Sequence, residues 1–244
     1  MNSPQSKRVA AKRHLRNVYI RLQTLAGSIL FLGLFVAASA LSFFAWLADE
    51  VTDGDTLALD ETARLYVNGF ASEPLTALMN SVTLLGSTLF LSVVFICVLI
   101  IFIRRNWTRS AVLLTAAMLG AVILNFVLKV NFARPRPIPF FGTPLPDSYS
   151  FPSGHALFAM CFYGALAWLI AVRVPSKSVK TLIWMSAFVI VLLIGLSRIY
   201  LSVHYLSDVL AGYAAATVWI LTIISTDSIL KNRISFLKKQ TPND

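Results

Sequence analysis

The chain has few cysteines, few histidines and few acidic residues. Its 244 residues include 2 cysteines, 3 histidines and 11 aspartates and glutamates. Cys97 and Cys161 both lie inside apolar runs, with no partner at metal-ligand spacing, so neither a disulfide framework nor a thiol site is indicated. No cluster of Asp, Glu and His suggests a metal site. The sequence therefore predicts no metal and no cofactor.

Charged residues are also scarce, at 13% of the chain, whereas hydrophobic residues make up 57% and the mean hydropathy is +0.73. Soluble domains hold about 45–50% apolar residues, so the composition indicates a membrane protein. A bilayer core needs roughly 17–25 apolar helical residues per span. The pattern predicts an all-α, six-transmembrane helical bundle, with spans at Thr24–Leu47, Leu85–Ile103, Ala111–Leu128, Ala156–Val172, Val179–Leu196 and Val209–Ile224.

The chain shows no internal repeat, no low-complexity tract and no second soluble domain. We therefore expect one membrane domain, residues 24–230, between a basic N-terminal segment, residues 1–23, and a basic tail, residues 231–244.

The basic residues are distributed unevenly between the two sets of connections. Sixteen of the 21 Lys and Arg residues precede the first span, follow the second, separate the fourth from the fifth, or close the chain. Short cytoplasmic loops carry the positive excess, so we expect both termini to be cytoplasmic. The net charge of +10 is then mostly a signal for the orientation of the chain in the membrane. It also attracts anionic lipids at the cytoplasmic face, by about 1 kcal/mol for each cation near the membrane. Nucleic-acid binding is not predicted.

The external connection between the first two spans is acidic. Within it, apolar residues recur at helical spacing and predict an amphipathic helix that lies on the membrane surface. Two interpretations stay open: an ordinary packing helix over the bundle, or a gate for the substrate. The apolar positions are Leu59, Ala63, Tyr66, Val67 and Phe70.

The external connection after the third span gathers cations. It contains five prolines before Pro152 and cannot be one continuous helix. Lys129 alone would be a snorkelling anchor. With Arg134 and Arg136 close to it in sequence, however, several cations gather in one external connection and need an anion to balance them. The planar guanidinium group of arginine suits phosphate oxygens.

The segment Pro152-Ser153-Gly154-His155 immediately precedes the fourth span. The free N–H groups and the positive dipole end of that helix would face the same loop, which is an arrangement suited to an anion. Ser153 can cap the helix or donate a hydrogen bond, and Gly154 allows a close backbone approach. A plain helix cap is the alternative.

His204 and Asp208 are four residues apart at the head of the sixth span, so both side chains lie on one helical face. A carboxylate there can hold the imidazole tautomer and make the histidine a competent nucleophile toward phosphorus. An isolated pair of this kind would more simply be a satisfied interfacial histidine. The pair is not isolated in this chain, because Arg198 precedes it at the end of the fifth span and His155 is a second histidine outside the N-terminal segment.

These residues resemble the three signatures of the type 2 phosphatidic acid phosphatase superfamily. The signatures are a lysine, six residues and Arg-Pro; Pro-Ser-Gly-His; and Ser-Arg, five residues, His, three residues and Asp. Lys129 to Arg136-Pro137, Pro152 to His155, and Ser197-Arg198 to His204 and Asp208 match all three spacings. The six spans, and the position of the motifs between them, resemble the membrane branch of the family.

The resemblance implies a role for each residue. His204 would attack phosphorus to form a phosphohistidine, Asp208 would orient it, and His155 would protonate the leaving oxygen and then activate water. Arg134 occupies a variable position of the first signature and would give only electrostatic support. The phosphoryl oxygens would be held by Lys129, Arg136, Ser153, Gly154 and Arg198.

The activity implied is hydrolysis of lipid mono- or diphosphates without a metal, at the outer interface of a bacterial inner membrane. Undecaprenyl pyrophosphate, phosphatidylglycerol phosphate and phosphatidic acid are candidate substrates, with a broad or undecaprenyl-pyrophosphate-directed phosphatase as the first choice by analogy. A lipid phosphotransferase and a non-catalytic lipid-phosphate transporter are the alternatives. The sequence makes no prediction of the oligomeric state.

Overall fold

A computed structural model describes residues 31–142 and 145–240 of the chain. The basic segment predicted at residues 1–23, and the start of the first predicted span, lie outside these residues. The described part is all-helical, with no strand. Its helices are Phe31–Asp53, α2 (Leu57–Asn68), α3 (Glu73–Leu84), α4 (Thr88–Arg104), α5 (Thr108–Phe132), α6 (Gly154–Ala171), α7 (Lys177–Tyr200) and α8 (Leu206–Gln240).

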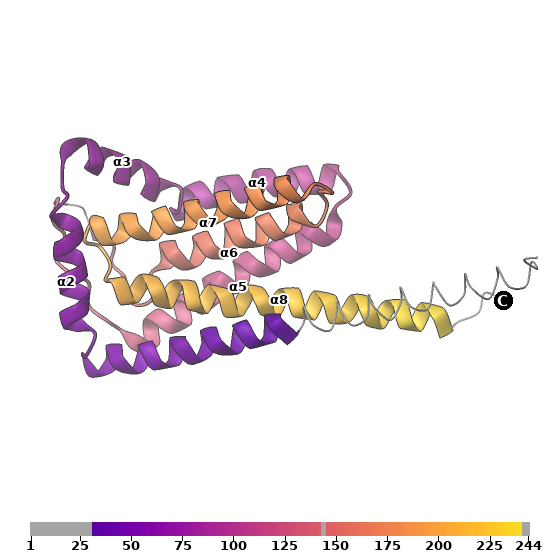
Figure 1. Cartoon of the computed structure of the whole chain (residues 1–244), viewed down its shortest axis with the longest axis horizontal. Coiled ribbons are helices and arrows are strands. Elements are labelled where there is room, and N and C mark those ends of the chain that lie inside the picture. The colour runs from indigo at the N-terminus through magenta and orange to yellow at the C-terminus, as the bar shows by residue number, and fades with distance from the viewer. Residues whose placement is uncertain (1–30, 143–144, 241–244) are drawn as a thin grey trace, which may run out of the picture.

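The long helices run alongside one another and form an elongated bundle (Figure 1). Among the described residues, five helices are long and apolar enough to cross a membrane. The second predicted span corresponds to α4, which reaches that length only together with α3, across a bend of 47°. By length and composition, the described residues thus offer five candidate membrane spans, or six if α3 and α4 form one bent span. The expected limits agree with α5, α6 and α7 to within a few residues, whereas α8 continues well beyond Ile224.

Helix α6 is the centre of the bundle and packs against α5, α7 and α8. Its inward positions are mostly small, with Ala156, Ala159 and Ala165 almost fully buried. Small side chains let helix backbones approach closely where lipid gives no hydrophobic drive between helices. The closest approach is at Gly212 of α8, where a Cβ atom would lie 2.8 Å from the carbonyl oxygen of Ser153. The starts of α6 and α8 are therefore held together.

Helix α2 lies across one end of the bundle, roughly perpendicular to the long helices (Figure 1). A helix is present where the apolar spacing predicts one. Its two buried residues are the charged Asp60 and Arg64, whereas the apolar Leu59 and Tyr66 are 63% and 69% exposed. The inward side of α2 therefore carries these two charged residues together with Val67, which packs against buried residues of the bundle, whereas Leu59 and Tyr66 face outward.

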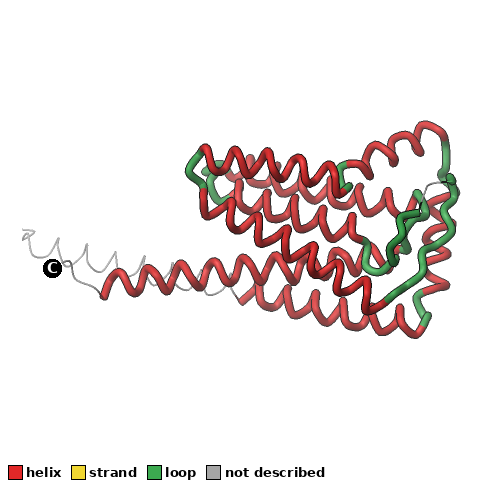
Figure 2. The backbone as a smooth tube through the Cα atoms, turned by 180° about the vertical axis from the view of Figure 1, so that it is seen from behind, coloured by secondary structure: helices red, strands yellow, loops and turns green. Residues whose placement is uncertain are grey.

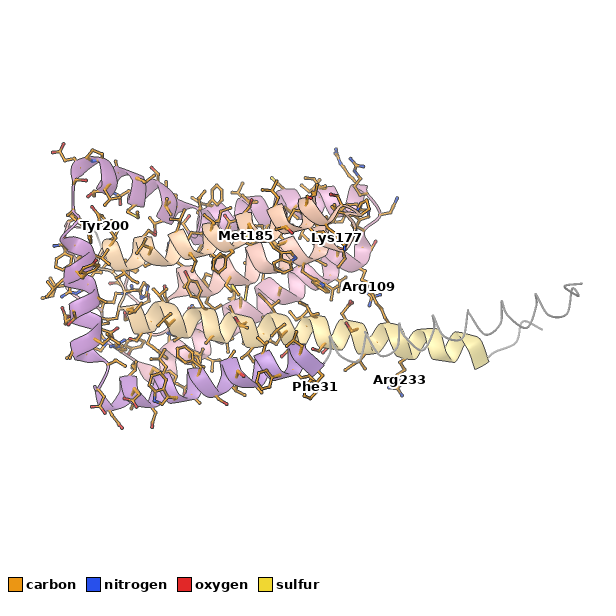
Figure 3. The ribbon with its side chains drawn as sticks, in the orientation of Figure 1. Phe31, Arg109, Lys177, Met185, Tyr200 and Arg233 are labelled. Carbon is orange, nitrogen blue, oxygen red and sulfur yellow. The ribbon has the colours of Figure 1, made fainter. Side chains whose placement is uncertain are left out.

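The three motif segments lie at the α2 end of the bundle, in its loops and in the helix ends that border them. Figure 2 shows the long connection from α5 to α6 passing over this end of the bundle. Helix α5 ends at Ala133, which adopts a left-handed backbone with φ of 45° and turns the chain into the proline-rich stretch. The short loop from Leu201 to Tyr205 joins α7 to α8 at the same end, where Figure 3 labels Tyr200.

Candidate active site

His204 and Asp208 form a buried pair at the start of α8. Their side chains are 2% and 0% exposed, and His204 Nδ1 lies 3.2 Å from Asp208 Oδ2. His204 lies in the loop two residues before α8, and Asp208 lies in the first turn of the helix, so the two side chains meet, although they do not share one helical face as the sequence predicts. The pair is also close to Ser150, whose hydroxyl donates to Asp208 Oδ2 and lies 3.3 Å from His204 Nδ1.

Two neighbours determine which nitrogen of His204 carries the proton. The Asp208 carboxylate can only accept a hydrogen bond, so Nδ1 must be its donor. Arg136 Nη1 lies 3.1 Å from Nε2 and can only donate a hydrogen bond, so Nε2 must be its acceptor. The hydrogen-bond network therefore assigns the proton to Nδ1 and leaves a lone pair on Nε2. This nitrogen is directed toward the cations of the first motif.

Asp208 is held from several directions besides His204. Its Oδ2 accepts from the backbone N–H of Tyr205 at 2.9 Å, and its Oδ1 accepts from Arg134 Nη1 at 2.7 Å. A buried carboxylate with this many donors keeps its position and its charge. Sequence reasoning did not find Ser150, because the loop spacing gives no signal for a contact over 58 residues.

The start of α6 is joined directly to the His–Asp pair. The N–H of Ser153 donates to the carbonyl oxygen of Asp208 at 2.9 Å. Ser153 is the N-cap residue of α6, yet its hydroxyl makes no cap hydrogen bond. The hydroxyl is fully buried and has no partner among the residues that the structure describes. A buried hydroxyl without a partner is costly and indicates a site for a ligand.

Arg198 comes from the last turn of α7 and is 8% exposed. Its Nη1 donates to Thr83 Oγ1 at 2.6 Å, at the end of α3. Its Nε is buried and, within residues 31–142 and 145–240, has no partner. Burying an unpaired guanidinium donor is more costly than burying an unpaired hydroxyl, so this group also indicates a binding site for an anion.

Lys129 and Arg136 lie on the loop side of the site. Lys129 Nζ donates to the carbonyl oxygen of Tyr149, and Arg136 Nε donates to that of Ser148 at 2.7 Å. Arg136 Nη1 also donates to the carbonyl oxygen of Val203 at 2.8 Å. Lys129 thus joins the proline-rich loop to α5, and Arg136 joins it to the α7–α8 loop.

An open cavity of about 810 Å³ adjoins Lys129. Part of its wall is the outer side of α5, and part is the proline-rich loop. The lining residues include Val122, Asn125, Phe126 and Val130 on α5 and Asp147, Ser148 and Tyr149 on the loop. The lining of the cavity therefore combines apolar side chains of α5 with polar and charged groups of α5 and the loop.

His155 lies in the first turn of α6, next to the break between α3 and α4. A Cβ atom at Gly86 would come within 3.3 Å of His155 Cδ2 and 2.5 Å of Ile194 Cγ2. The glycine therefore leaves room for the imidazole. His155 also lies within electrostatic reach of His204, Arg198, Arg136 and Lys129.

Arg134 lies behind the pair, with its side chain 10% exposed. Its guanidinium joins Asp208 to Asp60 of α2, with Nη2 2.8 Å from Asp60 Oδ2. The guanidinium also stacks over the Tyr205 ring, 4.3 Å from the centroid. Sequence reasoning placed Asp60 in an acidic surface segment and did not find this contact.

The charges of the site shift the pKa values of its loop residues. Burial lowers the pKa of His204 to about 3 against the opposing effect of Asp208, so the imidazole is neutral at pH 7. Burial also lowers the pKa of Arg136. The pKa of Arg134 is raised, because Asp208 and Asp60 more than offset the effect of burial.

The three predicted motifs therefore meet at one end of the bundle, although they are separated in sequence. His204, Asp208, Ser153 and Arg136 are connected by hydrogen bonds, whereas His155 is a neighbour by position and charge. No group of three or more His, Cys, Asp or Glu side chains is placed to hold a metal ion within the part of the chain that the structure describes.

Residues 110–229 match the PAP2 superfamily. The chain is 30% identical over 201 residues to "Phosphatidylglycerophosphatase B" of Bacillus subtilis (strain 168), an alignment that covers 81% of this chain and 98% of the relative. It is 31% identical over 126 residues to an "Undecaprenyl-diphosphatase" of Sulfolobus acidocaldarius, covering 50% of this chain and 56% of that protein.

Two solved structures are similar to this fold. One is the crystal structure of a transmembrane PAP2 type phosphatidylglycerolphosphate phosphatase from Bacillus subtilis, with a TM-score of 0.73 and 28% identity. That match covers 79% of this chain and 96% of the solved chain. The other is LpxE of Aquifex aeolicus, with a TM-score of 0.53 and 26% identity, covering 69% of this chain and 95% of that one.

Proposed function

Because the chain belongs to the PAP2 superfamily, we propose that it is an integral membrane phosphatase that removes phosphate from lipid mono- or diphosphates through a phosphohistidine on His204. The chain is a phosphoric ester hydrolase by its family. The further steps of the proposal concern the mechanism, the side of the membrane and the substrate.

The observation that carries the mechanism is the pair of buried, unpartnered donors beside His204. Ser153 Oγ and Arg198 Nε lack a partner among the described residues, and both belong to motifs that converge at the His–Asp pair. A tetrahedral anion between them would satisfy both groups at once. Oxygens of a phosphoryl group have the geometry and the charge for this, and Arg136 would contact them beside Nε2 of His204.

The proposed reaction has two steps. The lone pair of His204 Nε2 attacks phosphorus, the bond from phosphorus to the leaving oxygen breaks, and His155 gives that oxygen its proton. Water then attacks the phosphohistidine, transfers a proton to His155, and the nitrogen–phosphorus bond breaks to release phosphate. Asp208 keeps the proton of His204 on Nδ1 and stabilises the positive charge that forms on the ring.

Fixed cations and N–H groups supply the remaining stabilisation. Charge accumulates on the equatorial phosphoryl oxygens during transfer, and donors held in place lower the barrier because they need no reorganisation. Lys129, Arg136 and Arg198 would bind these oxygens, together with Ser153 and the amide of Gly154 at the start of α6. Arg134 would act indirectly, through Asp208.

We further propose that the site faces outward at the extracytoplasmic surface of a bacterial inner membrane, with both termini cytoplasmic. In this topology α3 and α4 cross together as one bent span and complete a set of six. Helix α2 would lie in the interface, since its apolar side chains are exposed and its polar side chains face the bundle. The distribution of basic residues supports this orientation.

The cavity beside Lys129 supports a lipid substrate. A phosphate bound at His204 would leave a lipid group to extend past Lys129 toward the apolar side chains of α5. The named activities of the relatives make phosphatidylglycerophosphate and undecaprenyl diphosphate the first substrates to examine, with phosphatidic acid as a third.

One assay tests the proposal directly. Purified protein is incubated with a panel of lipid mono- and diphosphates in the presence of EDTA, and released phosphate is measured. We expect release from at least one lipid, insensitive to EDTA, and a covalent phosphoenzyme after a rapid quench in alkaline detergent that is stable to base and labile to acid, as phosphohistidine is. Transfer of the phosphate to a second lipid instead would identify a phosphotransferase. If the protein bound these lipids tightly but released phosphate from none of them, the proposal would be contradicted.

A further inference from the structure

Asp60 of α2 is buried in the middle of a helix whose neighbouring side chains face outward. Its side chain is 1% exposed. The carboxylate accepts from the N–H of Ser207 at 2.9 Å, from the hydroxyl of Ser207 at 2.6 Å and from Arg134 Nη2 at 2.8 Å. A carboxylate is costly to bury unless donors surround it, and here each donor belongs to the segment around Asp208 or to the first motif.

Arg134 connects this carboxylate to the one beside His204. Its Nη1 donates to Asp208 Oδ1 at 2.7 Å and to the hydroxyl of Ser207 at 2.7 Å, while Nη2 is bound to Asp60. Asp208 uses its other oxygen, Oδ2, for His204. One guanidinium thus lies between two carboxylates, and only one of the two contacts the imidazole.

The charges of this cluster explain why a second carboxylate is present. Arg134 alone would neutralise Asp208 and weaken its attraction for a positive imidazole ring. With Asp60 included, two carboxylates and one guanidinium carry one net negative charge on the Nδ1 side of His204, opposite Arg136 at Nε2. In a buried site such a charge acts strongly, because little water screens it. The charge is needed when His204 attacks and its ring becomes cationic.

Helix α2 is fixed to the two loops that carry the motifs. Arg64, one turn after Asp60, donates to the hydroxyl of Ser202 at 2.5 Å and to the carbonyl oxygen of Ile138 at 2.7 Å. Ser202 precedes His204 in the α7–α8 loop, and Ile138 follows Arg136 in the proline-rich loop. The position of Asp60 is therefore set by contacts on both sides of the site.

We infer that Asp60 is a positioning residue for the phosphatase reaction: acting through Arg134, it holds Asp208 in place and preserves the negative charge that His204 needs. The inference rests on the proposed function. It assigns to the external helix a part in the chemistry that is neither simple packing nor gating of the substrate.

The test compares two Asp→Asn variants on the same segment. Asp60→Asn keeps the shape of the side chain and removes its charge, so kcat should fall by about 10- to 100-fold while KM changes less than about 3-fold. Asp55→Asn makes the same charge change at an exposed position five residues earlier, and should keep the wild-type kcat. Equal kcat in the two variants would overturn the inference.

A double-mutant cycle shows whether Asp60 acts through Asp208. In an Asp208→Asn background, adding Asp60→Asn should lower kcat by less than about 2-fold, because the group that it supports is already lost. A further loss equal to that in the wild-type background would overturn the inference. A purely structural role of α2 would give that additive result.

Ser207→Ala serves as a second variant should Asp60→Asn not accumulate in the membrane. It removes the hydroxyl that bridges Asp60 and Arg134 while both charges remain, and a loss of kcat of about 3- to 10-fold with KM unchanged is expected. An unchanged kcat would contradict the inference. Wild-type protein and Asp55→Asn report on the proposed function itself: if neither releases phosphate from any lipid, that function fails and the inference with it.

Discussion

Helix α8 carries two buried aspartates, one in its first turn and one well beyond its middle, and their clusters differ in how far water reaches them. Asp227, the second of them, is 4% exposed and pairs with Arg109 and Lys231, whose side chains are 48% and 54% exposed. At the start of α8, Asp208 is fully buried and pairs with Arg134, which is itself 10% exposed. Figure 3 labels Arg109 at the end opposite Tyr200.

The difference in exposure indicates different uses of the same residue types. Water screens the cations of the Asp227 cluster, so that cluster ties α5 to α8 and exerts little field on the bundle. The Asp208 cluster is enclosed, contains a second carboxylate from α2, and has an imidazole as its next neighbour. An enclosed cluster with unpartnered donors beside it is typical of a reactive site rather than of a structural contact.

The largest effect should come from the nucleophile of the enclosed cluster. His204→Ala is expected to lower phosphate release by about 10⁴-fold or more, because no other group can replace Nε2. The protein should still insert in the membrane and keep its thermal midpoint in detergent to within a few degrees. Release measured with the best lipid substrate is the readout. Full activity of this variant would contradict the mechanism.

The next effect separates the two clusters directly. Asp208→Asn should lower kcat by about 10³-fold with little change in KM, since the amide cannot hold the tautomer or the positive ring of His204. Asp227→Asn is the matched control, the same change at a buried aspartate of the same helix, and should leave kcat within about 2-fold. If both variants lost activity equally, the contrast between the clusters would be wrong.

A smaller loss is expected at Arg198, whose Nε has no partner among the described residues. Arg198→Ala should lower kcat/KM by about 10²- to 10³-fold, because it removes donors to the transferring oxygens. The same variant should weaken inhibition by inorganic phosphate, which tests whether Nε binds the anion. Arg109→Ala is the control from the other cluster and should leave both quantities unchanged. If inhibition by phosphate were unaltered in Arg198→Ala, Arg198 would not be one of the residues that bind the phosphoryl oxygens.

The Asp227 cluster should matter for stability alone, and modestly. Asp227→Asn leaves Arg109 and Lys231 without their partner, but both can turn toward water. We expect a loss of about 1 kcal/mol, seen as a thermal midpoint a few degrees lower in detergent. A loss of thermal stability as large as that of a core truncation would show that this cluster is enclosed after all.

The smallest effect concerns the charge of His204 between pH 7 and pH 5. Burial lowers its pKa from 6.5 to about 3, so the free enzyme should keep this imidazole neutral over that range. The unfolded chain, with the ordinary pKa, takes up the proton first, so the contribution of His204 to stability falls as the pH drops from 6.5 toward 3. NMR titration of the ring, assigned by difference from His204→Gln, measures this. A midpoint near 6.5 would contradict it.

Much of the helical framework could be predicted because it depends on local composition. Runs of apolar residues long enough to cross a bilayer indicate α5, α6 and α7 without any tertiary information. The second span was harder, since α4 is short and Gly86 lies at a bend whose angle depends on packing against Ile194 and His155. The extent of α8 beyond Ile224 also exceeds the hydropathy signal, because a helix can continue into a polar sequence.

The candidate site was predictable only where its residues are close in sequence or match a family signature. His204 and Asp208 are four residues apart in the sequence, and the Pro-Ser-Gly-His segment leads into a span. Asp60, Thr83 and Ser150 were not found. Each contributes through a contact with a distant segment, and no periodicity encodes which donor a buried carboxylate or arginine will meet.

The amino-acid sequence alone was sufficient to predict a helical membrane protein with three motifs suited to binding a phosphate group, because hydropathy and the spacing of residues within a motif are local quantities. Which side chains complete those motifs depended on the folded arrangement. Asp60 and Arg64 of α2 turn inward, and Ser153 and Arg198 keep donors that no described residue satisfies, as a result of helices packing across long distances in the chain. Burial is a property of the assembled bundle, and it is burial that turns ordinary charged residues into a candidate reactive site.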